Sequence, residues 1–302
     1  MRIRDIKAFT LHMEYPGRKG FVYAGGQVTG RVTSLVRVRT DTGETGWGAS
    51  YAYPDLAKII IERHLAPHLV GADPLDIEGH WQKMYGLTRW YGRKGVALSA
   101  LGGIDIALWD LRGKALGMPL YRLLGGKRNT VPAYASGLFW HDDPKELHAE
   151  TRRHLQRGFR RVKMRLGRSR EYDAAALDAV STGLDAGSQL IVDGSHRYSM
   201  ESAEEMGGQL AEHDAYWFEE PFPPEDLHSY VELRRRISVP LAMGENDFGY
   251  QGFREMLLAG AVDIAQPDAC RAAASRNAAG SEPWPGKRGS RSQRTPGATP
   301  WP

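Results

Sequence analysis

The sequence is poor in the features that mark disulfide-rich, membrane-spanning and secreted proteins. Its 302 residues hold one cysteine, Cys270, which excludes an internal disulfide framework. No apolar run approaches the roughly 18 residues that a membrane span needs. Residues 1–15 alternate like a strand and form no apolar signal core. We therefore expect a cytoplasmic protein with no membrane partner.

An excess of positive over negative charge is found only at one end of the chain. The net charge is +4, but residues 271–302 hold six Lys/Arg against one Glu, so the rest of the chain carries −1. A nucleic-acid-binding domain concentrates basic residues on a folded face. We therefore expect no nucleic-acid partner.

The same residues, 271–302, also lack Val, Ile, Leu, Met, Phe and Tyr. A segment with this composition buries too little apolar surface to offset the entropy of ordering, so we expect a disordered C-terminal tail. Histidine is missing there as well, because none of the ten follows His228.

The N-terminal part, residues 1–126, shows strands followed by helices. Residues 33–50 alternate apolar and polar side chains around a turn at 41–44, which predicts antiparallel strands. Residues 56–71 and 99–126 have apolar residues at helical spacing and end at Gly and Pro. This order indicates an α+β domain.

After Gly126 the pattern becomes a repeat of short apolar runs and amphipathic helices. Such alternation indicates a parallel sheet with buried strands, and six units in a row favour a (β/α) barrel. A doubly wound sheet is the alternative, but no Gly-rich phosphate loop follows the first strand. The six runs are 131–136, 161–166, 189–195, 216–221, 239–245 and 262–268.

Three of these strands end in an acid at equal spacings of 26 residues: Asp193, Glu219 and Glu245. One βα unit has about this length, so the three carboxylates should lie side by side on the C-terminal rim of the barrel. Acids that converge without a cation raise one another's pKa. Oxygen ligands of this kind favour Mg²⁺, with Mn²⁺ next. Taken singly, each acid also fits an ordinary helix cap.

Two further strand ends carry charged candidates. Lys163 and Arg165 lie two residues apart on one strand, so both side chains face the same way and would point at the metal site. Asp268 ends the sixth strand. A surface Lys-x-Arg pair and a capping Asp are the ordinary explanations of these residues.

Several motifs together resemble the enolase superfamily in its mandelate racemase and muconate lactonizing enzyme branch. They are GGIDIALWDLRGKALGMPLYRLLGG, VKMRLG, IVDGS, WFEEP, MGEN and QPD, in this order within residues 1–270. The resemblance implies a modified (β/α)7β TIM-like barrel, here incomplete after the sixth strand, under an N-terminal α+β capping domain. The expected limits are 1–126 for the cap, 127–270 for the partial barrel and 271–302 for the tail.

The resemblance also implies a reaction and its residues. Asp193, Glu219 and Glu245 would hold Mg²⁺, with Glu220 as their neighbour. The chemistry would start with removal of a proton α to a carboxylate, and the metal would stabilise the enediolate that results.

The sequence departs from the family's Lys-x-Lys pair, since Arg165 replaces the second lysine. A guanidinium stays protonated and is a poor base, and Lys163 needs a lowered pKa to act as one. We therefore expect a dehydratase of sugar acids, aldonates or aldarates, that relies on a His–Asp dyad. Asp268 resembles the aspartate of that dyad. A racemase or epimerase of 2-hydroxy acids is one alternative, and a catalytically dead metal-binding fragment is the other.

The dyad histidine should follow Asp268 by about one βα unit, yet the sequence has none there. A shifted reading frame after Cys270 is one hypothesis that explains this, since with suitable codons it spells an apolar strand that ends in His near Arg294. A natural basic, disordered tail is the alternative. We expect this 302-residue chain to be poorly stable and weakly active. Sequencing the gene tests the frame hypothesis.

The expected partner is a small-molecule carboxylate, and the resemblance allows a homo-oligomer. The substrate-binding candidates are Ser136 at the first barrel strand, Asn246 beside Glu245, and the loop residue Tyr53. Tyr15 lies in another loop that would face the substrate, although loop tyrosines usually only pack.

Overall fold

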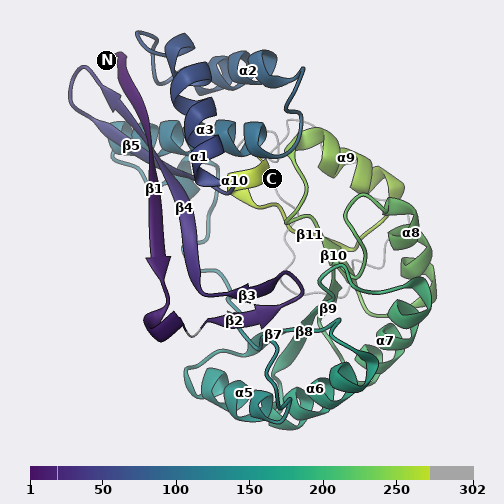
Figure 1. Cartoon of the computed structure of the whole chain (residues 1–302). Helices are drawn as coiled ribbons and strands as arrows, with labels where there is room; N and C mark the ends of the chain where they lie inside the picture. The colour runs from purple at the N-terminus through teal and green to yellow at the C-terminus, as the bar shows by residue number, and fades with distance from the viewer. Residues whose placement is uncertain (19, 273–302) are drawn as a thin grey trace.

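The computed structural model describes residues 1–18 and 20–272 (Figure 1). Of the predicted tail, all but its first two residues lie outside the described residues, as does the position proposed for the dyad histidine. No helix in the described part of the chain is long and apolar enough to cross a membrane.

The N-terminal part, the cap, is an antiparallel sheet of three strands in the order β1-β4-β5, with helices on one face. A two-stranded hairpin, β2–β3, extends from it. The strands are β1 (Ile3–Glu14), β2 (Phe21–Tyr23), β3 (Gly26–Val28), β4 (Gly30–Thr40) and β5 (Thr45–Ser50). The helices are η1 (Pro16–Arg18), α1 (Pro54–Ile59), η2 (Ile60–Leu65), η3 (Ala66–His68), α2 (Ile77–Thr88), α3 (Val96–Leu116) and α4 (Leu120–Leu123).

The long helix α3 lies directly on strand β5, and two glycines allow this close approach. A Cβ atom on Gly46 would lie 2.0 Å from the carbonyl oxygen of Ala107, and one on Gly48 would lie 2.1 Å from that of Gly103. Backbone therefore packs on backbone at these two positions, which leaves no room for any side chain.

The C-terminal part contains six parallel strands in the sequential order β6 to β11. The strands are β6 (Ala135–Ser136), β7 (Arg161–Arg165), β8 (Gln189–Asp193), β9 (Trp217–Glu219), β10 (Leu241–Met243) and β11 (Ile264–Ala265). The helices are α5 (Glu146–Gln156), α6 (Arg170–Gly183), α7 (Met200–Glu212), α8 (Leu227–Arg236), α9 (Gly249–Ala259) and α10 (Ala269–Ala272).

These strands form an arc, and helices α5 to α9 all lie on its outer side (Figure 1). A doubly wound sheet would reverse its strand order and carry helices on both faces. The structure thus confirms the predicted fold class, an incomplete (β/α) barrel with an α+β cap.

Residues of the central strands alternate between the two faces of the arc. Val162, Val192 and Phe218 are fully buried and belong to the core between strands and helices. Ile191 of β8 and Trp217 of β9 each precede one of these residues by one position, and they belong to a small separate cluster on the inner face. Both faces are therefore covered, as expected for parallel strands.

Polar side chains fix where the barrel helices begin. Ser169, Ser199 and Asp226 are the N-caps of α6, α7 and α8, and each side chain accepts a hydrogen bond from a backbone N–H of the first turn. Such caps satisfy donors that the helix leaves free. They set the lengths of the loops that follow the strands.

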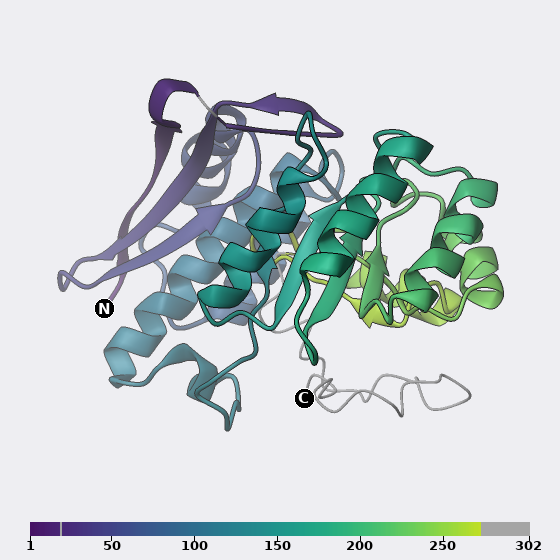
Figure 2. The ribbon, with the colours of Figure 1, turned by 90° about the horizontal axis from the view of Figure 1, so that it is seen from below.

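The cap and the barrel arc lie side by side and are in contact (Figure 2). The β2–β3 hairpin reaches the loop after β6, where Val22 pairs with Trp140 and the Phe21 and Phe139 rings stack with centroids 3.8 Å apart. At the other end of the arc, α10 packs on α3.

The contact between β5 and α3 yields a stability prediction. Gly48→Ala should lower the free energy of unfolding by about 2 kcal/mol, because overpacking forces backbone apart. Urea denaturation measures this. The matched control is Gly86→Ala in α2, where a Cβ meets nothing within 4 Å. Equal stability of the Gly48 variant and the wild type would contradict the close approach.

Candidate active site

Three charged residues form one row across three neighbouring strands at the C-terminal rim. Arg165 of β7 pairs in register with Asp193 of β8, and Asp193 pairs with Glu219 of β9. Neighbouring strands lie about 4.8 Å apart, so adjacent side chains in such a row are within contact distance. The register thus brings these three predicted residues together.

Lys163 lies two residues before Arg165 and faces the same side. Its ammonium group donates a hydrogen bond to Glu219 Oε1 and lies 3.0 Å from Asp193 Oδ2. The side chain is 3% exposed. Burial works to lower the pKa of Lys163, but the charges of the two acids outweigh it and the pKa is raised. Lys163 is therefore a protonated counter-ion in this arrangement.

Asp193 has two cationic neighbours, since Arg165 also pairs with its Oδ2 atom. Burial tends to raise the pKa of Asp193, but Lys163 and Arg165 hold it below the ordinary value. Its other oxygen accepts a hydrogen bond of 2.9 Å from the backbone N–H of Ser195. Asp193 is thus ionised and fixed in place.

Glu219 is 1% exposed and almost saturated with donors. Besides Lys163, the indole N–H of Trp217 and the amide of Gln266 each donate to Oε2 at 3.0 Å. Gln266 Oε1 is buried and has no hydrogen-bond partner among the described residues. Besides Trp217 of β9 itself, Lys163 of β7 and Gln266, which follows β11, thus help to orient this carboxylate.

Glu245 follows β10 and is more exposed than the other two acids. Partial removal from water raises its pKa. The charge of Lys163 opposes this effect, and the charges of Glu219 and Glu220 add to it. No hydrogen bond or ion pair of its carboxylate is found in residues 1–18 and 20–272. Additional positive charge near Glu245 would stabilise its ionised form and lower its pKa.

No three His, Cys, Asp or Glu side chains of the described residues are grouped closely enough to hold a metal. The donor chemistry nevertheless suits Mg²⁺, since the three proposed ligands offer carboxylate oxygens. A cation, Lys163, already lies between two of these acids. The assignment of Asp193, Glu219 and Glu245 as metal ligands therefore stays a prediction.

A second polar cluster at the rim was not anticipated as a unit. His196 Nε2 lies 2.6 Å from Glu220 Oε2, and Asn246 donates to the same oxygen at 2.7 Å. The bond to Glu220 raises the pKa of His196. Glu220 and Asn246 were each named from the sequence, whereas His196 was not, and its only signal was its position three residues after Asp193. The predicted substrate contact of Asn246 is untested, and its amide here binds Glu220 and Arg271.

The backbone at the rim is conformationally unusual. Leu138, Ser195, His196 and Glu220 all have positive φ, from 37° to 60°. Non-glycine residues rarely adopt this region, and it clusters at functional sites where surrounding structure holds it. These four residues follow β6, β8 and β9 at the rim, whereas Asp214, with φ 50°, precedes β9.

The remaining candidates lie apart from the acids. Asp268 Oδ1 accepts a hydrogen bond of 2.7 Å from the N–H of Cys270, and no described histidine bonds to it. Tyr53 precedes α1 and is 68% exposed, with no described side-chain bond. Their predicted catalytic and binding roles stay predictions.

A cavity of about 510 Å³ lies between the cap and the rim. Ser136 and Arg165 from the barrel line it, together with Tyr15 and Arg31 from the cap. Substrate-sized pockets have about this volume. The structure thus places the candidate Ser136 in one pocket with Arg165.

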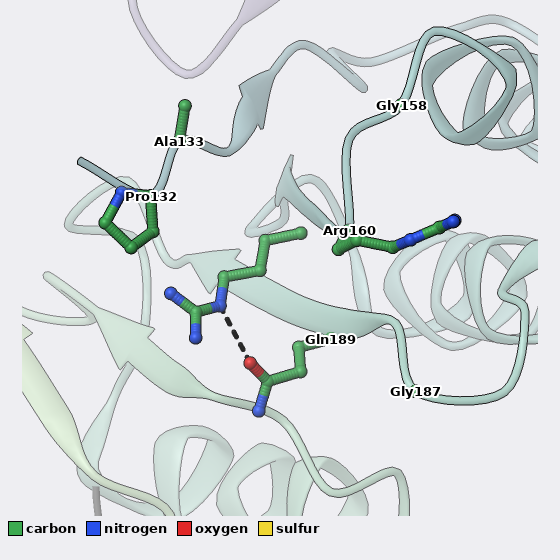
Figure 3. A pocket seen from close by; sticks show the side chains of 7 residues that line it. Pro132, Ala133, Gly158, Arg160, Gly187 and Gln189 are labelled. Carbon is green, nitrogen blue, oxygen red and sulfur yellow. Dashed lines mark hydrogen bonds between the residues drawn. The ribbon is translucent and has the colours of Figure 1, made fainter. Parts of the chain in front are cut away.

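A second cavity, of about 340 Å³, lies at the opposite end of the strands (Figure 3). Gly158 and Gly187 at its wall precede β7 and β8, and Arg161 Nε donates to Gln189 Oε1 at 2.7 Å. Catalytic residues of such barrels lie at the C-terminal face. This cavity is therefore not the reaction site.

Comparison with known proteins decides the family. Residues 5–125 match "Mandelate racemase / muconate lactonizing enzyme, N-terminal domain", and residues 146–279 match "Enolase C-terminal domain-like". The chain belongs to the enolase superfamily, in its mandelate racemase and muconate lactonizing enzyme branch. The resemblance inferred from the motifs is confirmed.

The relatives include enzymes of sugar-acid metabolism. D-galactarolactone cycloisomerase of Agrobacterium fabrum is 36% identical over 244 residues, which cover 80% of this chain and 64% of that protein. Arabinonate dehydratase of Saccharolobus solfataricus is 35% identical over 236 residues, 76% of this chain and 63% of that protein. The chain thus spans slightly less than two thirds of the length of these relatives.

Solved structures of similar fold agree with this family assignment. The 3,6-anhydro-D-galactonate cycloisomerase from Zobellia galactanivorans aligns with a TM-score of 0.82 and 32% identity, covering 90% of this chain and 74% of that one. The L-talarate dehydratase from Polaromonas sp. JS666, complexed with Mg and L-glucarate, aligns with a TM-score of 0.79 and 27% identity over 89% and 73% of the two chains.

The His196–Glu220 pair predicts a pH-dependent contribution to stability in metal-free protein. Because the folded-state pKa of His196 is raised, the stabilisation is full below the unfolded value of about 6.5 and is lost as pH rises through the folded value. His196→Gln should cost about 1 kcal/mol at pH 6 and little at pH 9. Urea unfolding at both pH values, with His148→Gln on the exposed side of α5 as control, measures this. An equal cost at both would contradict it.

Proposed function

We propose that this chain is part of a Mg²⁺-dependent enzyme that removes the proton α to the carboxylate of a sugar acid and then eliminates water. The observation that carries the proposal is the row formed by Arg165, Asp193 and Glu219 at the rim. Lys163 pairs with both acids, and Arg165 also lines the cap cavity. The relatives that act on sugar acids and the solved complex with Mg and L-glucarate support it.

Asp193, Glu219 and Glu245 are the proposed metal ligands. A bound Mg²⁺ would stabilise the negative charge that develops on the substrate carboxylate as the proton leaves. The pKa directions support this, since Glu245 is poorly compensated and Asp193 stays ionised beside its two cations.

Arg165 is the proposed contact to the substrate carboxylate. It is permanently charged and presents a planar fork of donors that matches a carboxylate. It lines the cap cavity while it pairs with Asp193, so it joins the acids to the space for substrate.

Lys163 is the proposed base on this face of the site. It is charged while it lies between Asp193 and Glu219, and the neighbouring charge of Arg165 acts to lower its pKa. It accepts a proton only when the two acids are neutralised by another cation. Asp268 remains the candidate for the opposite face, in a dyad whose histidine lies outside the described residues.

The test is exchange of the α-proton with solvent. In D2O with Mg²⁺ and a panel of sugar acids, proton NMR should show loss of the α signal and formation of a keto acid. Lys163→Met should slow exchange by at least about 100-fold. The matched control Lys7→Met removes an exposed lysine of β1 and should react like the wild type.

Other outcomes separate the alternatives. Exchange without loss of water would show a racemase or epimerase. Metal and acid binding without exchange would show a binding protein that lacks catalysis. No binding of either would refute the proposed function.

A further inference from the structure

The cap cavity is walled by the β2–β3 hairpin on one side and by the barrel rim on the other. Tyr15, Phe21 and Arg31 line it from the cap, and Ser136, Phe139 and Arg165 line it from the barrel. Two arginines thus face one cavity, and only Arg165 also contacts the acids of the rim.

Arg31 is exposed to solvent, and two neighbouring side chains contact its guanidinium. Its Nε donates to the hydroxyl of Tyr15 at 3.0 Å, and its guanidinium lies over the Phe21 ring, 5.1 Å from the centroid. In the described part of the chain no carboxylate forms an ion pair with it. An arginine held by a hydroxyl and a ring keeps several N–H donors available.

The hairpin is anchored so that the position of Arg31 relative to the rim is defined. Phe21 stacks on Phe139, and Trp140 bridges to Val22. The Trp140 indole donates to the carbonyl of Arg165 at 3.1 Å. Strand β4, which carries Arg31, follows this hairpin directly. Few rotatable segments therefore separate the two arginines.

We propose that Arg31 binds the second acidic group of a dicarboxylate sugar acid whose reacting end lies at Arg165. This rests on the proposed function and narrows its substrate to aldarates, acids with a carboxylate at both ends. A planar guanidinium pairs best with a planar carboxylate. A monocarboxylate of the same length would leave the charge of Arg31 unused.

The test compares two acids that differ only at C6, galactarate and galactonate. Calorimetric titration with Mg²⁺ present should show tighter binding of galactarate by the wild type. Arg31→Met should weaken the binding of galactarate by about tenfold, which is the contribution of one exposed charge-assisted contact. The same variant should bind galactonate as tightly as the wild type does. Arg4→Met removes an exposed arginine of β1 outside the cavity and should bind both acids like the wild type.

A variant that keeps the charge guards against a folding artefact. Arg31→Lys should retain part of the preference for galactarate, and thermal unfolding checks that each variant is folded. The ratio of the two binding affinities separates a specific contact from a general loss of structure, because misfolding weakens the binding of both acids equally.

The outcomes distinguish the two proposals. An equal loss for both acids in folded Arg31→Met, or an undiminished preference for galactarate, overturns the role of Arg31 and leaves the proposed function standing. Tighter binding of 6-phosphogluconate than of galactarate overturns the choice of a carboxylate. Failure of the wild type to bind any of these acids refutes the proposed function and this inference with it.

Discussion

A single buried ammonium group organises the rim of this barrel. Lys163 lies between Asp193 and Glu219, both almost fully buried. Two such acids side by side would repel each other and raise their own pKa values without a cation. Removing one member of a buried ion pair leaves an uncompensated charge and is strongly destabilising. The arrangement at the strand ends therefore depends on Lys163, or on another cation in its place.

This constraint gives Lys163 two roles that exclude each other. While it neutralises Asp193 and Glu219 it holds its proton, and it becomes a base only when those acids are neutralised otherwise. Arg165 has no such alternative, since guanidinium stays charged. It can therefore serve as a constant link between the acids and the cap cavity, which Arg31 lines from the side of the cap.

Sequence patterns predicted the order of the strands and the row at the rim, because spacing near one βα unit fixes which side chains meet across a parallel sheet. Arg165, Asp193 and Glu219 followed from that rule. The link between Glu220, His196 and Asn246 did not, since it depends on loop backbone at positive φ. Nor did Arg31, because pairing of the hairpin with Trp140 joins residues from the two parts of the chain. The solvent-facing position of Tyr53 was equally hidden.

Calorimetric titration of Mg²⁺ into the wild type and into Lys163→Met tests the central claim most directly. If Lys163 is the counter-ion of the acids that hold the metal, one ion binds, and it binds more tightly once the competing ammonium group is gone. Equal or weaker binding by a folded Lys163→Met variant, or no binding by either protein, would contradict this account.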